Sequence, residues 1–149
     1  MDKIRIRAAK PEDGPALAPL SAQLGYPDPA EAIAGRLRGI LRRWDHAVFV
    51  AEDESGRLLG WIHIFIRPLL ILVPHAEVGG LVVDEQCRGE GVGQALLKAA
   101  ESWARSLRLE QVLIRSRESR VRAHAFYETR GYTRLKISHT FMKSLEESA

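Results

Sequence analysis

The stretch from Leu81 to Gln94 holds the residues whose types and spacing best suit a chemical task. It reads as an apolar strand, a glycine-rich turn and the start of an amphipathic helix. Such a turn leaves backbone N–H groups unpaired at a helix N-terminus, where the helix dipole adds partial positive charge. Glycine at alternate positions lets the backbone approach an anion without an intervening Cβ. We therefore predict that the turn grips a phosphate or pyrophosphate through Arg88, Gly89, Glu90, Gly91, Val92, Gly93 and Gln94.

Three interpretations compete for this turn. It could simply reverse the chain, bind a dinucleotide, or hold the pyrophosphate of coenzyme A. The dinucleotide pattern Gly-x-Gly-x-x-Gly needs a third glycine where Gln94 stands, and Glu110 precedes the next predicted strand instead of ending it. The dinucleotide interpretation therefore fails, and the residues of the turn alone leave the other two open.

Two motifs resemble the signatures of the GNAT superfamily of acyl-CoA-dependent N-acetyltransferases. The first is Arg88-x-x-Gly91-x-Gly93, directly after a strand that ends in Val-Val-Asp. The second, Ala-His-Ala-Phe-Tyr-Glu-x-x-Gly-Tyr, occupies residues 123–132 and follows at the expected separation. The resemblance covers essentially the whole chain. It implies acetyl-CoA as cosubstrate and a primary amine, on a small molecule or a peptide, as acceptor.

The resemblance also implies residues that bind the cosubstrate. In the family the backbone of the strand before the turn, here Leu81, Val82 and Val83, pairs with the pantetheine arm. A main-chain N–H, for which Val83 is our candidate, would hold the thioester carbonyl oxygen and stabilise the developing oxyanion. Arg120 stands where many members have an asparagine that contacts the coenzyme, so Arg120 could instead reach a phosphate. One or more arginines of the surrounding basic region could bind the 3′-phosphate of coenzyme A or an acidic substrate, or the region could be a solvated face. It comprises Arg115, Arg117, Arg120 and Arg122.

Tyr127 and Glu77 are the predicted catalytic residues. Tyr127 matches the family tyrosine near the coenzyme sulfur, where a phenol could protonate or orient the thiol leaving group; otherwise it packs as a core aromatic. Glu77 lies eleven positions before Arg88 (88 − 77), where some members place a carboxylate that deprotonates the amine. The alternative is a strand-edge glutamate that sits in solvent or binds substrate charge. His63 and His75 are secondary candidates for the base.

The single cysteine, Cys87, excludes an internal disulfide and a thiolate metal cluster. The resemblance gives Cys87 no catalytic role, so we expect direct acetyl transfer in a ternary complex without an acyl-enzyme. No spacing of histidine, cysteine or acidic residues indicates a metal site.

The rest of the sequence predicts the elements that position these residues, in the order β-α-α-β-β-β-α-β-α-β. Asp53 to Gly56 has the composition of a hairpin turn, and Gly79-Gly80 inside a strand indicates a bulge or a close ligand. Asp28 and Ser119 are predicted helix caps. Strands are expected at residues 3–7, 47–52, 58–66, 77–84, 111–115 and 134–142; helices at 11–24, 28–41, 91–107 and 121–129. The fold class is therefore α/β (α+β): a mixed, mostly antiparallel, six- to seven-stranded twisted sheet with helices on both faces.

Composition limits the classes of protein further. At 149 residues, 46% apolar and 28% charged, the chain suits one globular domain over residues 1–149. The net charge is +3 with no run of five basic residues, so a nucleic-acid partner is not favoured. The N-terminus lacks a signal peptide and no apolar stretch is long enough for a membrane span, so we expect a cytoplasmic protein, with a homodimer possible. The rival functions are a catalytically silent acyl-CoA-binding regulatory module and a nucleic-acid-binding domain that uses the arginine cluster.

Overall fold

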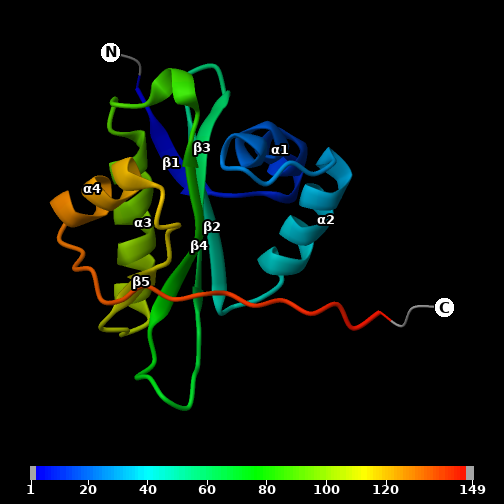
Figure 1. Cartoon of the computed structure of the whole chain (residues 1–149). Helices are drawn as coiled ribbons and strands as arrows, with labels where there is room; N and C mark the ends of the chain where they lie inside the picture. The colour runs from blue at the N-terminus through cyan, green and yellow to red at the C-terminus, as the bar shows by residue number, and fades with distance from the viewer. Residues whose placement is uncertain (1–2, 147–149) are drawn as a thin grey trace. The chain divides into compact units, whose positions relative to one another are not determined.

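Figure 1 shows the computed structural model of the chain, which describes residues 3–146. The chain forms two compact units, residues 1–115 and residues 116–149, and each is considered by itself. The single-domain expectation stays a prediction. No helix among the described residues is long and apolar enough to cross a membrane.

The first unit is built on a five-stranded sheet in the order β1-β2-β3-β4-β5. Pairing is antiparallel from β1 through β4, and β5 runs parallel to β4. The strands are β1 (Arg5–Ala8), β2 (His46–Glu52), β3 (Leu58–Ile66), β4 (Ala76–Val83) and β5 (Val112–Ile114). This confirms the predicted mixed, mostly antiparallel sheet, but six or seven strands was wrong because five are present among the described residues.

Helices cover both faces of this sheet, as predicted (Figure 1). They are η1 (Pro11–Asp13), α1 (Gly14–Gln23), α2 (Ala30–Leu41), η2 (Glu85–Cys87) and α3 (Val92–Ser106), where η denotes a short 3-10 helix. Helices α1 and α2 lie on one face and α3 on the other. The second unit contains α4 (Val121–Thr129) and no strand among its described residues.

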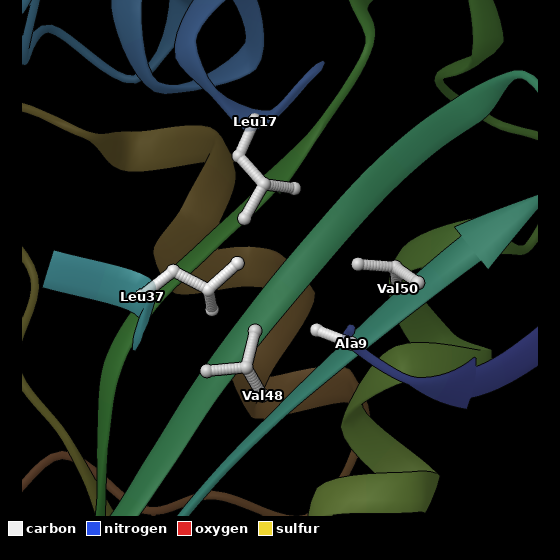
Figure 2. Close-up of a cluster of buried hydrophobic side chains, with 5 residues drawn as sticks. All are labelled: Ala9, Leu17, Leu37, Val48 and Val50. Atoms are coloured by element: carbon white, nitrogen blue, oxygen red, sulfur yellow. The ribbon is translucent and has the colours of Figure 1, made fainter. Parts of the chain in front are cut away.

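Alternation along the strands makes one core on each face of the sheet. On the α1–α2 face, Ala9, Leu17, Leu37, Val48 and Val50 pack together, as Figure 2 shows. On the other face, α3 buries the side chains of Val92, Leu96, Leu97, Ala100 and Ala104. Burial of apolar side chains at about 25 cal/mol per Å² makes these two layers the main source of stability of the first unit.

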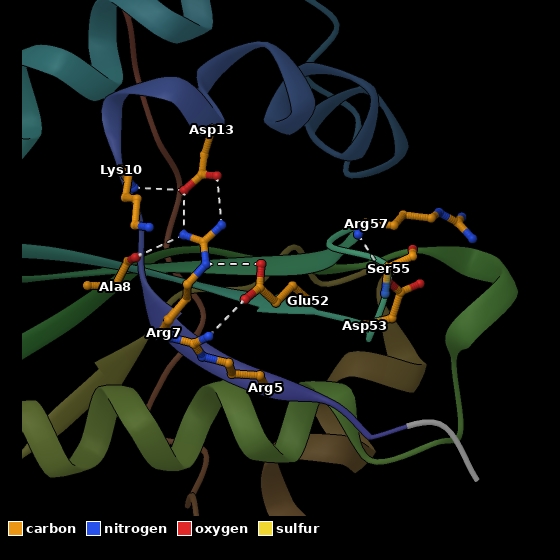
Figure 3. Close-up of polar contacts among 9 residues, drawn as sticks. All are labelled: Arg5, Arg7, Ala8, Lys10, Asp13, Glu52, Asp53, Ser55 and Arg57. Carbon is orange, nitrogen blue, oxygen red and sulfur yellow. Dashed lines mark hydrogen bonds and ion pairs between the residues drawn. The ribbon is translucent and has the colours of Figure 1, made fainter.

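An ion-pair cluster ties the first strand to its neighbours (Figure 3). Arg7 donates to both oxygens of Asp13, at 2.7 and 2.9 Å, and its Nε lies 3.1 Å from Glu52 on β2. Asp13 also accepts from the main-chain N–H of Lys10 at 2.7 Å, which closes η1. The hydrogen bonds from Arg7 lower the pKa of Asp13, so its carboxylate stays ionised at neutral pH.

Three local predictions were wrong. Asp28 does not cap α2: Pro29 is the N-cap residue, and Asp28 accepts from the Arg36 guanidinium at 2.6 Å. Ser119 does not cap α4, whose N-cap residue is Arg120. Residues 134–142 form no strand, and their apolar side chains are exposed. Alternation of apolar and polar residues is typical of a strand with one buried and one exposed face, but a strand forms only where a second strand pairs with it. No strand among residues 3–146 pairs with this segment.

Candidate active site

The turn after β4 is held by Asp84. Its Oδ1 accepts from the Gln86 N–H at 3.1 Å, its Oδ2 accepts from Arg57, and its own N–H donates to the Leu59 carbonyl at 2.8 Å. The bond from Gln86 and the nearby Arg57 charge hold the pKa of Asp84 below its ordinary value. Arg57 follows the predicted hairpin turn, which the structure confirms through the bonds of Asp53 to the N–H groups of Ser55 and Arg57 (Figure 3). The β2–β3 hairpin therefore anchors the start of the glycine-rich turn.

The bend that follows, residues 88–94, has the properties of an anion cradle. Gly89 and Gly91 adopt φ of +85° and +86°, a region that side chains disfavour, and a Cβ built on either would meet no atom within 4 Å. Gly91 is the N-cap residue of the 15-residue helix α3 and offers no side-chain cap. The N–H groups of Val92, Gly93 and Gln94 lie in the first turn of α3 and have no partner within the helix, and none of them donates to another described part of the chain. Unfilled donors at the positive end of a long helix, with open space before them, fit a pyrophosphate.

The main chain of β4 is partly open on the side of β5. Pairing with β5 covers Ala76, Glu77 and Val78 and stops there, so residues 79–83 have no partner strand on that side among residues 3–146. An extended ligand could therefore pair with Leu81, Val82 and Val83 as an added strand. The open edge leads directly into the bend.

Gly79 is the extra residue of a β-bulge in β4, as the sequence predicted. His63 pairs with Gly80 and Ile64 pairs with Val78, which leaves Gly79 without a partner in the ladder. A Cβ on Gly79 would lie 2.8 Å from His63 Nδ1, and one on Gly80 would lie 2.7 Å from the Trp61 ring. Both glycines are thus required by close packing against β3.

Glu77 is a buried carboxylate held by two arginines. It is 4% exposed. Arg67 Nη1 donates to its two oxygens at 3.0 and 2.9 Å, and Arg115 Nε donates to Oε1 at 3.1 Å. His75, which is fully buried, places Nε2 3.7 Å from the same oxygen. The alternative in which Glu77 sits in solvent is excluded.

A stack of three rings lies beside the bulge. His46 and His63 are parallel at 5.2 Å between ring centroids, Phe65 lies against both, and His46 Nδ1 is 2.9 Å from His63 Nε2. Burial lowers the pKa of His63 to about 4 and also lowers that of His46. Both imidazoles are therefore neutral at neutral pH, and one donates to the other.

In the second unit, Tyr127 lies on α4. Its ring meets those of Phe126 and Tyr132 edge-on, at 5.4 and 6.0 Å between centroids. Burial raises the pKa of the Tyr127 phenol, so the hydroxyl keeps its proton at neutral pH. Arg120, the other site residue predicted in this unit, is exposed at the start of α4.

Sequence reasoning missed the contacts of Arg67 and Arg115 with Glu77, and it missed His46. The first two flank Glu77 only because β3 and β5 are registered on either side of β4. That register depends on pairing across a nine-residue connection (residues 67–75), which carries no turn pattern that would fix it. Only the alternation of apolar and polar residues around Phe65 could have hinted that Arg67 shares its face.

An open β4 edge that runs into a glycine bend at a helix N-terminus defines a class of protein: an acyltransferase whose donor is an acyl-CoA. Comparison with known proteins agrees. The sequence matches the acetyltransferase (GNAT) family over residues 17–132. An aminoglycoside N(6')-acetyltransferase type 1 from Stenotrophomonas maltophilia is 31% identical over 148 residues, which cover 97% of this chain and 95% of that protein. A mycothiol acetyltransferase from Thermobispora bispora is 31% identical over 142 residues, 90% of this chain but 48% of that longer protein.

Solved structures give the same fold. The aminoglycoside 6'-N-acetyltransferase AAC(6')-Ih from Acinetobacter baumannii superimposes with a TM-score of 0.85 at 16% identity, covering 97% of this chain and 100% of that one. A putative acetyltransferase from Agrobacterium tumefaciens superimposes with a TM-score of 0.81 at 26% identity, covering 93% and 99%. The chain belongs to the GNAT acetyltransferase family. Family membership confirms the predicted enzyme class, an N-acetyltransferase, and acetyl-CoA as its cosubstrate.

Proposed function

We propose that this protein transfers the acetyl group of acetyl-CoA to a primary amine of a small molecule by direct attack within a ternary complex. The observation that carries the proposal is the set of unpaired N–H groups in the first turn of α3, at residues 92–94, next to the open edge of β4. Two relatives support a small-molecule acceptor, although their substrates differ. One is named for aminoglycosides and the other for mycothiol.

In this proposal the donor lies along β4 and ends at the bend. The main chain of Leu81, Val82 and Val83 pairs with the pantetheine arm, and the Val83 N–H stabilises the oxyanion. The amides of residues 88–94 hold the pyrophosphate, with Arg88 at the rim and Arg120 as a further phosphate contact. Positioning of this kind lowers the entropic cost of bringing the thioester and the amine together.

Two side chains move protons in the proposed reaction. The amine nitrogen attacks the thioester carbon, the C–S bond breaks, and Tyr127 gives its proton to the departing sulfur. Glu77 takes the proton from the amine through a water molecule. A carboxylate has about four acceptor positions; Arg67 and Arg115 use three, which leaves one on Oε2 for that water.

Cys87 does not form an acyl-enzyme in this scheme. The thiol is buried, and its removal from water raises its pKa. A protonated, enclosed thiol is a poor nucleophile, so the amine itself must attack the donor.

The bend is tested by titration calorimetry of acetyl-CoA against Gly91→Trp, with Gly56→Trp as matched control. Gly56 has φ of +87° and open surroundings like Gly91, but it lies in the β2–β3 hairpin turn. The two variants therefore carry the same backbone strain and the same added bulk. We expect Gly91→Trp to lose at least about tenfold in affinity, which is about 1.4 kcal/mol, and Gly56→Trp to bind as the parent protein does. Equal affinity in all three proteins would place the pyrophosphate elsewhere.

A further inference from the structure

We propose that Arg67 and Arg115 bind an oxyanion of the acceptor, so that the acceptor is a small molecule with a carboxylate or phosphate near its amine. The inference rests on the proposed function, because it names the class of acceptor for the same reaction. It follows from the position, charge and unfilled hydrogen bonds of the Arg67–His75–Glu77–Arg115 cluster.

The two arginines reach Glu77 from the strands on either side of it. Phe65 on β3 and Leu113 on β5 lie opposite Glu77, so all three side chains point to one face of the sheet. Arg67 and Arg115 come two residues after Phe65 and Leu113, directly beyond the ends of β3 and β5, and their side chains reach Glu77 on that face. It is the face on which Trp61 packs against the α1–α2 core. The cluster therefore lies on the same side of β4 as the His46–His63–Phe65 stack.

The cluster holds more positive charge than its carboxylate neutralises. One arginine would balance the buried charge of Glu77, whereas two leave an excess of one. The Glu77 side chain is 5% exposed, but those of Arg67 and Arg115 are 37% and 50% exposed. Glu77 thus fixes two guanidinium groups whose outer surfaces remain accessible.

Most N–H groups of these guanidiniums are unused. Arg67 bonds through Nη1 and Arg115 through Nε; their other N–H groups donate to no acceptor among residues 3–146. Each guanidinium has five N–H donors in a planar fork that matches a carboxylate or phosphate. Two such forks, held by one buried carboxylate, form an oxyanion site.

His75 gives a second, independent sign of a ligand. Its Nδ1 lies 3.0 Å from the Val73 carbonyl, which can only accept, so Nδ1 carries the hydrogen. Nε2 is fully buried, lies 3.7 Å from Glu77 Oε1 and has no hydrogen-bond partner among the described residues. A buried polar atom without a partner is costly. A water or a polar group of the acceptor would satisfy Nε2 while the oxyanion satisfies the arginines.

The same charge disfavours polycationic acceptors. A second cation brought to a site with net positive charge is repelled, and the repulsion grows as the site is desolvated. The chain would then differ in acceptor from the relative named for aminoglycosides, although the two align over 148 residues at 31% identity.

The test compares matched acceptors in an assay of thiol release from acetyl-CoA. The panel pairs amino acids with their amides and aminoalkyl phosphates with the corresponding amino alcohols, and it includes kanamycin as a polycation. We expect the anionic member of a pair to be preferred by at least about tenfold in kcat/KM. A preference for the amino acid or for the phosphate identifies which oxyanion is bound.

The variants are Arg67→Gln and Arg115→Gln, with Arg105→Gln as control. Arg105 is exposed on α3, on the opposite face of the sheet. We expect the first two to raise KM for the anionic acceptor about tenfold or more relative to its neutral twin and to leave KM for acetyl-CoA unchanged. Because both arginines also hold Glu77, a fall in kcat is expected to be shared by the charged and neutral twins. Arg115→Lys should restore part of the loss, since it keeps the charge without the fork.

The outcomes separate the two proposals. Turnover of amides or kanamycin in preference to the anionic amines would overturn the inference and leave the acetyl transfer intact. Equal losses of kcat/KM in the arginine variants for the anionic acceptor and for its neutral twin would also overturn the inference. A second measurement is calorimetry of the anionic amine in the presence of coenzyme A. Binding that depends on Arg67 and Arg115 without any turnover would support the oxyanion site and refute the proposed function.

Discussion

At the scale of single residues, Glu77 shows which properties of the site could be predicted from the sequence and which could not. The family resemblance was enough to single it out, because some members place a catalytic carboxylate eleven positions before the motif arginine, here Arg88. Its burial between two arginines was not foreseeable, since Arg67 and Arg115 are 10 and 38 positions away and meet it through strand pairing. The role of Glu77 as the base stays a prediction.

Glu77→Gln should remove the acidic limb of the pH–rate profile. If the carboxylate accepts the amine proton, activity falls when it is protonated, and an amide cannot titrate in this way. The variant sets an NH2 group against the guanidiniums, so we also expect a loss of about 1–3 kcal/mol in stability, to be followed by denaturant titration. Glu110→Gln, at an exposed position, is the control. A folded Glu77→Gln protein with the parent acidic limb would show that another group, or water alone, takes the proton.

Tyr127→Phe should lower kcat by about 100-fold or more with little change in KM for acetyl-CoA. Burial raises the pKa of this phenol, so it is protonated at neutral pH and able to supply a proton to the leaving sulfur. Phenylalanine keeps the edge-on ring contacts of the aromatic cluster and removes only the hydroxyl. Steady-state kinetics check the prediction, and thermal melting checks the fold. If kcat is unchanged, the hydroxyl is not the acid and Tyr127 serves only in packing.

At the scale of elements, the sequence was most informative where a local pattern has one structural solution. The Asp53–Gly56 turn, the Gly79 bulge and the helix after the bend were all predicted and are present. The failures have a different cause. Aspartate is a common helix N-cap residue, yet the Asp28 carboxylate accepts a hydrogen bond from the Arg36 side chain of α2 instead of from main-chain N–H groups. Residues 134–142 have the alternation of a strand, but pairing is a property of two segments and cannot be read from one.

The ring stack on β2 and β3 should make the first unit sensitive to acid. The His63 pKa falls from 6.5 to about 4 on folding, because burial disfavours the charged ring. Between these two pH values the unfolded chain binds more protons than the folded one, so stability declines as pH falls and levels off below about 4. From pH 7.5 to pH 5 the loss from this group is about 2 kcal/mol.

His63→Gln isolates this effect because glutamine does not titrate. Denaturant unfolding at pH 7.5 and at pH 5 measures the loss in each protein, and carboxylates that titrate in both cancel in the difference. We expect the variant to lose about 2 kcal/mol less than the parent over this interval. Identical pH dependence in the two proteins would mean that the imidazole is hydrated and titrates normally.

For the molecule as a whole, the bend and the open edge of β4 that are proposed to hold the cosubstrate lie in the first unit. A ligand that binds only the folded state adds about 2.7 kcal/mol at a hundred times its Kd, which raises Tm by about 5–10 °C for a chain of this length. All three tryptophans, Trp44, Trp61 and Trp103, lie in residues 1–115. Tryptophan fluorescence therefore follows the unfolding of the first unit, whereas circular dichroism at 222 nm (a standard helix signal) also follows α4.

We expect saturating acetyl-CoA to raise the Tm of the first unit in both signals, because the bend and β4 belong to that unit and its helices α1, α2 and α3 contribute to circular dichroism. Gly56→Trp should show the same shift, and Gly91→Trp should show little or none; circular dichroism is the signal to compare for these two, since each variant adds a tryptophan. No shift in either signal for the parent protein would contradict binding at the bend, since the amides there would then have no ligand to stabilise the folded state.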